Sequence, residues 1–232
     1  MKWLGPLSLI GLVASVACTG NVDPAWELDH DRVIAVKMEP PRIQPGESST
    51  ITGLIGHVGA PPDEEVPETA VVDSPAGLDH ALARGAMGWT VTAPPDSELA
   101  AARTELGLAP TDPVPLRVKM TFPTHDPVAY KVVWLSDTAA NPVINPITID
   151  GKDALMETSL IVAKQTKIPT VVHFDDTYDI NWLTSCGTMH DFDLASAYLK
   201  VDPTDAQSGT FAIVVRDLRG GVAWHVWPIT AQ

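Results

Sequence analysis

The amino-acid sequence predicts an all-β protein made of two antiparallel β-sandwich domains, with a short helix inserted in the first domain. Three observations lead to this prediction. The 232-residue chain has 21 prolines and 16 glycines spread along it, which favours short strands joined by turns. Many segments alternate apolar and polar residues with a period of two, as half-buried antiparallel strands do. Similar strand segments also recur in the two halves of the chain.

The recurring segments form two pairs. The first pair is "GWTVTAP" around Trp89 and "AYLKVDP" around Tyr198, and the second is "VAYKVVW" at 128–134 and "VAWHVW" at 222–227. The first pair lies 109 residues apart when aligned on the closing prolines, and the second pair lies 94 apart. Two copies of one module explain both spacings if the first copy holds 15 extra residues. Chance similarity between short strands is the alternative explanation.

We expect the first domain to span residues 32–140. Its opening strand, "RVIAVKMEP", places Ile34, Val36 and Met38 on one face, because alternate residues of a strand share a face. A turn at "QPGE" precedes the strand "STITGLIG", and "PLRVKMTF" and "YKVVWLSD" form a late hairpin.

The extra segment of the first domain is "DSELAAARTELGL". Asp96 or Ser97 can cap a short helix, Leu99 and Leu106 lie seven residues apart, and Gly107 can end the helix. This segment supplies the residues that the second copy lacks.

We expect the second domain to span residues 141–232. Its strands are "SLIVAK", "TVVHF", "DINWLTS", "AYLKVDP", "TFAIVVRD" and "GVAWHVWPI". Gly220 and Gly221 in "DLRGG" allow positive φ in the last turn. Trp224 and Trp227 lie three residues apart, so they face opposite sides of a strand. One of them belongs in the core, and the other is either an exposed aromatic for binding sugar or protein, or is covered by a loop.

The first 17 residues have the features of a secretory signal peptide. Lys2 is followed by an apolar run from Leu4 to Val16 and then by small residues before Cys18. The run is shorter than the ~20 residues that a membrane-spanning helix needs. An ordinary secretory peptide, with Cys18 as a plain cysteine, is one interpretation.

The stretch "SVAC" resembles the lipobox of bacterial lipoproteins, although Ser15 stands where that family usually has leucine. The resemblance implies that Cys18 is lipidated and becomes the first residue of the mature protein, with residues 18–31 as a tether. Thr19 after the cysteine, in place of an inner-membrane retention Asp, implies an outer-membrane location. A multiply acylated protein is stably anchored, since each buried methylene adds ~0.8 kcal/mol.

The charge of the chain excludes two classes of partner. The formal net charge is −14, which repels nucleic acid and anionic lipid headgroups and suits basic partners or divalent cations. The chain has two cysteines. If a lipid occupies Cys18, Cys186 has no disulfide partner and is expected to be a small buried side chain.

Several strand segments resemble immunoglobulin-like domains. "IAVKMEPPRIQPGESSTITGLI" is similar to the opening strands of the bacterial forms, and "INWLTSCGTM" with "SGTFAIVVRDLRGGVAW" is similar to the core of a second such domain. Taken whole, the chain resembles a group of cell-surface lipoproteins of myxobacterial type. This resemblance implies two immunoglobulin-like sandwiches but no activity, because the fold serves many functions.

Two polar loops carry the candidate metal ligands. "HFDDTYD" and "SCGTMHDFD" bring together acidic and imidazole side chains, at Asp175, Asp176, Asp179, His190, Asp191 and Asp193. Calcium prefers oxygen ligands, and zinc accepts thiolate and imidazole, but neither loop has the ligand spacing of a dedicated site. We therefore interpret the loops as polar turns and expect no resident metal or cofactor.

The sequence predicts a lipid-anchored envelope protein with a non-catalytic role in binding or assembly. The expected partner is another envelope protein or a surface polysaccharide, and no nucleic acid. No Gly-x-Ser-x-Gly elbow and no phosphate-binding glycine loop occurs in the sequence. The alternative is a calcium- or other metal-binding module, or a hydrolase accessory, centred on residues 173–193.

Overall fold

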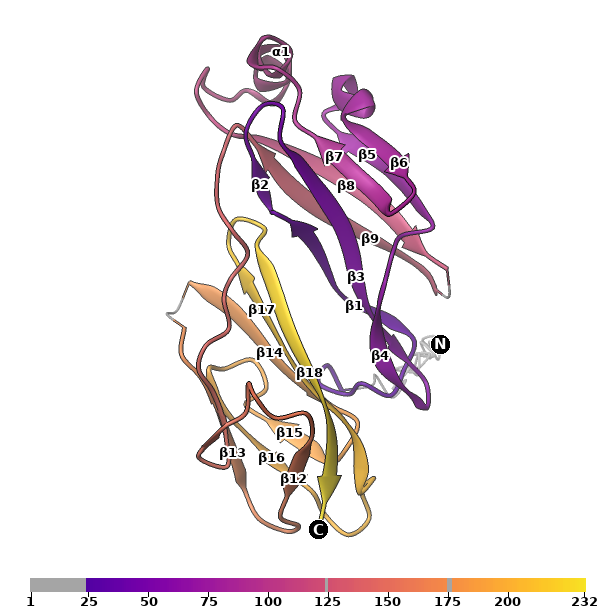
Figure 1. The fold of residues 1–232 in the computed structure, drawn as a ribbon, viewed down its shortest axis with the longest axis vertical. Helices are drawn as coiled ribbons and strands as arrows, with labels where there is room; N and C mark the ends of the chain where they lie inside the picture. The colour runs from indigo at the N-terminus through magenta and orange to yellow at the C-terminus, as the bar shows by residue number, and fades with distance from the viewer. Residues whose placement is uncertain (1–23, 124, 175–176) are drawn as a thin grey trace, which may run out of the picture.

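The computed structural model describes residues 24–123, 125–174 and 177–232, except for the side chains of residues 125–127. It contains four β-sheets, paired into two sandwiches that lie one above the other in Figure 1. The all-β, immunoglobulin-like fold predicted from the sequence is confirmed.

In the first sandwich, one sheet has the order β1-β3-β7-β6, with β4 paired to β3, and the other has the order β2-β9-β8-β5. All of its strand pairs are antiparallel except β2 with β9. The strands are β1 (Arg32–Glu39), β2 (Arg42–Ile43), β3 (Ser48–His57), β4 (Ala60–Glu65), β5 (Thr69–Ser74), β6 (Leu82–Gly85), β7 (Gly88–Thr92), β8 (Val114–Phe122) and β9 (His125–Leu135).

In the second sandwich, the sheets have the orders β11-β10-β13-β16-β15 and β12-β18-β17-β14. Again all strand pairs are antiparallel except one, β12 with β18. The strands are β10 (Ile147–Ile149), β11 (Lys152–Asp153), β12 (Leu160–Val162), β13 (Ile168–Val172), β14 (Tyr178–Thr184), β15 (Thr188–His190), β16 (Ser196–Lys200), β17 (Ser208–Asp217) and β18 (Val222–Ala231).

The two sandwiches share one topology. In each, a parallel edge strand (β2 or β12) lies beside the last strand (β9 or β18), followed by the penultimate strand and then β5 or β14. The sequence pairs that indicated a repeat fall on equivalent strands, β7 with β16 and β9 with β18. The repeat in the sequence therefore corresponds to a repeat in the fold.

The extra residues of the first copy form helix α1 (Asp96–Leu106), between β7 and β8. The helix ends at Gly107, whose φ of 67° suits the left-handed conformation that glycine adopts readily. The expectation for its start is wrong. Pro95 precedes the first turn without a side-chain cap, and the carboxylate of Asp96 instead accepts a hydrogen bond from Ser136 Oγ at 2.9 Å. A short 3₁₀ helix, η1 (Ala76–Ala81), follows β5.

Each sandwich has its own apolar core. Met38, Leu116 and Val133 are fully buried in the first. The second is built around three aromatic rings: Phe211 lies 5.8 Å from Trp182 and 6.1 Å from Trp227, measured between centroids. Cys186 is buried in this second core with a free thiol, and burial raises its pKa. It behaves as the small apolar side chain that was expected.

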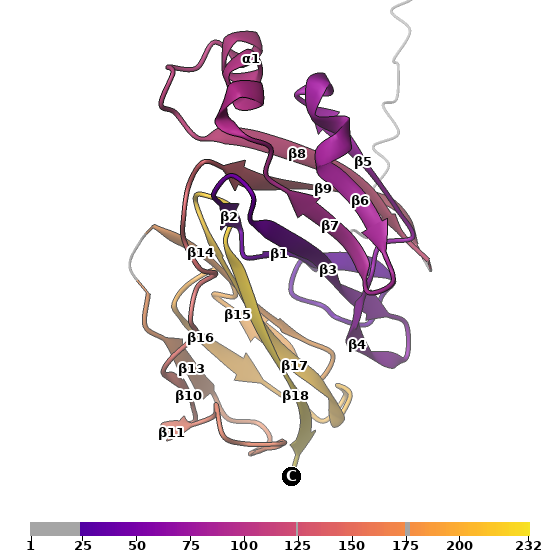
Figure 2. The ribbon, with the colours of Figure 1, turned by 45° about the horizontal axis from the view of Figure 1, so that its top comes forward.

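A third apolar cluster joins the two sandwiches. The outer face of the β1–β3 sheet packs against the outer face of the β14–β17–β18 sheet. The buried members of this interface cluster are Leu28, Ala35, Leu54, Leu183, Ala212, Val214 and Val222. In Figures 1 and 2, strands β17 and β18 run alongside β1.

Near the turn between β17 and β18, charged side chains also join the two sandwiches. Arg42 Nη2 donates to Asp217 Oδ2 at 3.0 Å, and Arg219 Nη2 donates to Asp137 Oδ2 at 2.7 Å. The turn between β17 and β18 approaches β9 closely, since a Cβ on Gly220 would lie 3.1 Å from Val132 O. Gly220 has the positive φ that its place in the turn predicted, at 91°.

The described part of the expected tether, residues 24–31, is packed against the second sandwich. Backbone hydrogen bonds join Leu28 N to Thr184 O and Thr184 N to Trp26 O, at 3.0 and 2.9 Å. Trp26 contacts the second core, and Leu28, which is 2% exposed, lies between the sandwiches. The segment therefore extends the β14 edge and helps to fix the junction. Cys18 lies outside the described residues.

Candidate functional site

The structure describes four of the six candidate metal ligands from the two polar loops. Asp179 lies on β14, where its carboxylate is 3.5 Å from Arg216 Nη1. His190 ends β15 and stacks on Tyr198, with ring centroids 4.4 Å apart. Asp191 and Asp193 lie in the turn that follows, and both are exposed. Asp175 and Asp176 lie outside the described residues.

Within the described residues, one group of metal-binding side chains has its ligand atoms within 4.8 Å of one another, and it lies elsewhere. It consists of His57, Asp63 and Glu65, in the first sandwich. Because two of the six loop candidates are not described, the structure does not test the choice between polar turns, which we predicted, and the alternative of a metal site around residues 173–193.

Trp224 and Trp227 face opposite sides of β18, as the strand period predicted. Trp227 is 1% exposed and lies in the second core. Trp224 packs at the junction, where its indole N–H donates to Glu64 Oε1 at 2.8 Å and the Lys37 ammonium lies 4.6 Å from its ring. The first sandwich therefore covers Trp224, so this face of the ring is not available to bind sugar or protein.

A groove at the junction lies between the edges of β1 and β9. Its volume is about 460 Å³, and a smaller pocket of about 160 Å³ adjoins it toward β14. Both are lined by Arg32 and by Arg216, which β17 contributes from the second sandwich. We call the two together the junction groove. It is a concave site at a domain interface, where ligand sites commonly occur.

Three cations line the junction groove: Arg32, Lys131 and Arg216. Arg216 Nη2 donates to Ile34 O at 2.9 Å and so crosses the junction. Arg32 Nη2 donates to Ala25 O at 3.1 Å, while its buried Nε has no hydrogen-bond acceptor among the described residues. Within the same residues, no carboxylate forms an ion pair with Lys131.

Burial raises the free energy of all three charges. Loss of water and, to a smaller extent, the nearby positive charge of Arg216 together lower the pKa of Lys131 to about 8, although Asp217 acts in the opposite direction. Burial also lowers the pKa values of Arg32 and Arg216. With a pKa of about 8, Lys131 is still mostly charged at pH 7. A bound anion would relieve the repulsion between Lys131 and Arg216.

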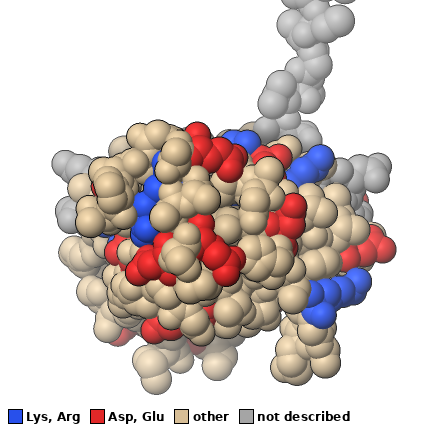
Figure 3. Space-filling view, turned by 90° about the horizontal axis from the view of Figure 1, so that it is seen from above, with Lys and Arg blue, Asp and Glu red and all other residues tan. Residues whose placement is uncertain are grey.

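The groove differs from the rest of this acidic molecule. The formal net charge of the chain is −14, and at the α1 end acidic and basic side chains appear in small separate groups (Figure 3). In the groove, by contrast, three half-buried cations lie together. A carboxylate-bearing ligand is the complementary chemistry.

One wall of the groove is a strand edge. β2 pairs with β9 at Trp134 and Leu135, and no described strand pairs with the rest of β9 on that side. Val128 and Tyr130 are exposed there, at 44% and 54%. A free edge of this kind has unpaired backbone donors and acceptors available to an added strand.

Sequence reasoning missed the junction groove, although it left one signal. The alternation that buries Val133 and Leu135 places Lys131 on the same, inward face of β9. A lysine on the apolar face of a strand is uncommon unless it is paired or lies at an opening. The contributions of Arg32 and Arg216 depend on how the sandwiches dock, and no local pattern reveals them.

Comparisons with known proteins show a likeness in structure alone. No protein-family profile and no curated protein matches the sequence. Tandem Ig repeats of Dlar align with a TM-score of 0.30 and 11% identity over 85% of this chain and 97% of that one. Murine CEACAM1b aligns with a TM-score of 0.28 and 8% identity, over 85% and 100%. The surface layer protein SbsC, domains 1–6, aligns with a TM-score of 0.24 and 13% identity, over 87% and 28%.

Proposed function

We propose that this protein is a lipid-anchored, non-catalytic binding protein of the cell envelope, which holds an acidic polypeptide segment in the junction groove. The observation that carries the proposal is the convergence of Arg32, Lys131 and Arg216 on one concave surface of an acidic chain. Charge-assisted hydrogen bonds to a carboxylate are about twice as strong as neutral ones, and they strengthen where water is excluded.

The free edge of β9 favours a polypeptide over a polysaccharide as the ligand. An extended peptide can add to such an edge through main-chain hydrogen bonds, while its alternate side chains point into the groove. Acidic side chains at those alternate positions would meet Lys131 and the two arginines. A polysaccharide would use the cations but not the strand edge.

The fixed junction supports binding by a preformed site. The interface cluster, the Arg42–Asp217 pair and residues 24–31 all hold the two sandwiches in one arrangement. The walls of the groove come from both sandwiches, so this arrangement sets its shape. A preorganised site avoids the entropic cost of ordering its walls when the ligand binds.

Attachment to the outer membrane rests on the lipobox resemblance at Cys18. Neither helix among the described residues is long and apolar enough to cross a bilayer. A chain lipidated at Cys18 reaches Pro24 within six residues, which span at most about 20 Å. The packed segment would then hold the sandwiches close to the membrane surface.

Binding of a labelled peptide tests the ligand assignment. The protein is the full chain with Cys18→Ser, and the probe is a fluorescein-labelled decapeptide of alternating Glu and Val, followed by anisotropy. We expect saturable binding that weakens with salt, and at least about tenfold weaker binding for Lys131→Gln, because a charge-assisted bond contributes ~1.5–3 kcal/mol. Lys152→Gln, on the distant β11, is the matched control and should bind like the parent.

Two outcomes would contradict this assignment. Equal affinities of the Lys131→Gln and Lys152→Gln proteins would show that the junction groove is not the binding site. Binding of a labelled galacturonate oligomer, with none of the peptide, would show that the ligand is a polysaccharide.

Membrane fractionation tests the anchor separately. The parent chain should appear in the outer-membrane fraction, and Cys18→Ser should move it to the soluble fraction. Retention of the Cys18→Ser protein in the membrane would disprove lipid attachment at this residue.

A further inference from the structure

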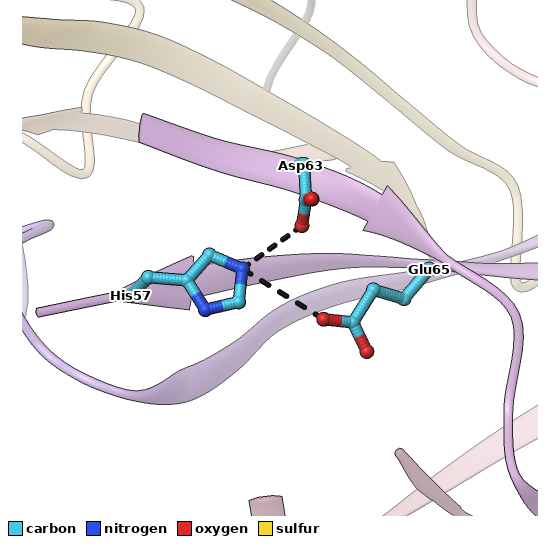
Figure 4. Close-up of side chains that lie close together, drawn as sticks. All are labelled: His57, Asp63 and Glu65. Carbon is cyan, nitrogen blue, oxygen red and sulfur yellow. Dashed lines mark hydrogen bonds and ion pairs between the residues drawn. The ribbon is translucent and has the colours of Figure 1, made fainter. Parts of the chain in front are cut away.

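The hairpin of β3 and β4 carries a cluster of side chains that the junction groove does not use. β3 ends at His57, and β4 returns with Asp63 opposite Ile55 and Glu65 opposite Gly53. Asp63 and Glu65 lie two residues apart on a strand, so both side chains project from one face. Figure 4 shows the ring of His57 directed toward both carboxylates.

The distances within this cluster match those around a small metal ion. His57 Nε2 lies 2.9 Å from Asp63 Oδ1 and 3.7 Å from Glu65 Oε1, and all three ligand atoms lie within 4.8 Å of one another. Ligands that bind zinc at ~2.0–2.2 Å are roughly 3.3 Å apart in a tetrahedron. The observed distances lie on either side of this value, so small side-chain rotations would allow all three groups to bind one ion.

The hairpin is held rigidly from outside the cluster. Its turn is fixed by two carboxylates, since Val58 N donates to Asp31 Oδ1 at 3.1 Å and Gly59 N donates to Asp29 Oδ1 at 2.6 Å. Glu64, on the opposite face of β4, accepts the hydrogen bond from Trp224. The backbone that carries the three candidate ligands is therefore anchored on both sides.

Two of the ligands are also largely shielded from solvent. The side chains of His57 and Glu65 are 20% and 16% exposed, whereas that of Asp63 is 66% exposed. Shielding restricts the rotamers of the first two, and the third remains open to exchange with water. This is the arrangement of a partly preformed site with an accessible side.

We propose that His57, Asp63 and Glu65 bind a divalent zinc ion. One imidazole nitrogen and two carboxylate oxygens form a ligand set that zinc accepts, whereas calcium requires six to eight oxygens. Three protein ligands leave at least one position for water. The site is separate from the junction groove and from the loops around residues 173–193.

Zinc at this site would stabilise the hairpin. The ion binds ligands from two strands only in the folded state, so it raises the free energy of unfolding as its concentration exceeds the dissociation constant. Because Glu64 on the same strand bonds to Trp224, the ion also stabilises a part of the junction.

Titration with Zn²⁺ alone tests the proposal. The protein is the tag-free full chain with Cys18→Ser, which removes a competing thiol. We expect isothermal titration to give one Zn²⁺ per chain and melting to shift to higher temperature with Zn²⁺. Asp63→Asn should weaken Zn²⁺ binding at least about tenfold, because even the loss of a group that only supports a metal ligand typically costs that much affinity. It should also abolish the Zn²⁺-dependent rise in melting temperature. Its exposed position makes this variant well tolerated.

A second histidine–carboxylate pair provides the matched control. His80 Nε2 lies 2.8 Å from Glu98 Oε2, but both side chains are exposed, and the part of the chain that the structure describes offers this pair no third ligand. His80→Gln should bind Zn²⁺ like the parent, whereas His57→Gln should not. No stoichiometric binding by the parent, or equal binding by the His57→Gln and His80→Gln proteins, would overturn the proposal. A calcium-dependent but zinc-independent shift would also overturn it.

Discussion

The β2-β9-β8-β5 sheet of the first sandwich and the equivalent β12-β18-β17-β14 sheet of the second carry different residues on their outer faces. In the second, the outer face of β17 and β18 carries Ala212 and Val214, and Trp224 lies opposite Val214. In the first, the equivalent positions on β8 and β9 carry Arg117 and Lys119, and Tyr130 lies opposite Lys119. The first face is open to solvent, whereas the second packs against its neighbour.

The comparison shows that docking, and not the fold, sets the composition of this face. β8 alternates buried and less buried residues along its length, as a strand with one wet face does. β17 is buried at six consecutive positions, from Thr210 to Val215. Both strands occupy the same place in the same topology. A strand whose two faces are both apolar therefore indicates that the outer face of its sheet is covered by another surface.

Exchange of residues between equivalent positions is the sharpest test of this comparison. Val214→Lys gives β17 the residue that β8 has, and it buries an unpaired charge in the interface cluster. We expect a loss of at least about 3 kcal/mol in the free energy of unfolding, measured by urea denaturation. The reciprocal change, Lys119→Val, should alter it by less than about 0.5 kcal/mol. Similar effects of the two changes would contradict the distinction between the faces.

The next largest effect is expected at Leu28, in the segment that packs between the sandwiches. Leu28→Ala removes a fully buried side chain and leaves a cavity at the junction, which costs about 2–5 kcal/mol. Leu194, which is 54% exposed, is the control, and Leu194→Ala should change stability by less than about 0.5 kcal/mol. If both variants melt like the parent, residues 24–31 do not contribute to the fold.

The aromatic pair at equivalent positions should give an intermediate effect. Trp224→Ala removes packing at the junction and leaves Glu64 without the indole N–H, so we expect a loss of about 2 kcal/mol. Tyr130→Ala, on the open face, should cost less than about 1 kcal/mol. Urea denaturation of both proteins measures the difference, and a larger loss for Tyr130→Ala would reverse the assignment of covered and open faces.

The smallest effect on stability is expected at the basic residue that follows each of these aromatic residues. It is Lys131 in the first sandwich and His225 in the second. Burial lowers the pKa of both side chains, that of Lys131 to about 8. Between this value and ~10.4, the unfolded chain binds a proton at Lys131 that the folded chain does not, so stability rises with pH. Below about pH 8 the folded state retains the full cost of the buried charge.

Lys131→Met removes this dependence. We expect the variant to be more stable than the parent at pH 7 by about 1 kcal/mol, because water in the groove screens part of the cost. The difference should shrink through pH 8–10.4 and vanish above it. Urea denaturation across this pH range measures it. A difference between the two proteins that does not change with pH would show that Lys131 is not desolvated.

The sequence allowed much of the fold to be predicted, because the strand signals are local. The period-two alternation, the prolines and glycines of the turns, and Gly107 at the end of α1 all act over a few residues. The duplication also followed from spacing, and strands β7, β9, β16 and β18 confirm it. The start of α1 was misjudged because Asp96 found a partner in Ser136, which lies on a distant segment.

The candidate sites were harder to predict from the sequence. The acidic loops have many carboxylates close together in the sequence, but in the structure Asp179 lies beside Arg216, and Asp191 and Asp193 are exposed. The ligands of the proposed zinc site are close in sequence as well, at His57, Asp63 and Glu65. They were missed because only the hairpin register shows that the three side chains share a face.

The two sandwiches, the inserted helix and the acidic character of the chain could be predicted from the sequence, because each depends on residues that are near one another or on simple composition. The docking of the two sandwiches was needed to show which sheet face is covered, where residues 24–31 pack, and that Arg32, Lys131 and Arg216 line one groove. These features arise from contacts between segments that lie far apart in the sequence, and even Lys131 and Arg216 are separated by 85 residues. Such contacts depend on the shapes of both surfaces, and local propensity does not encode them.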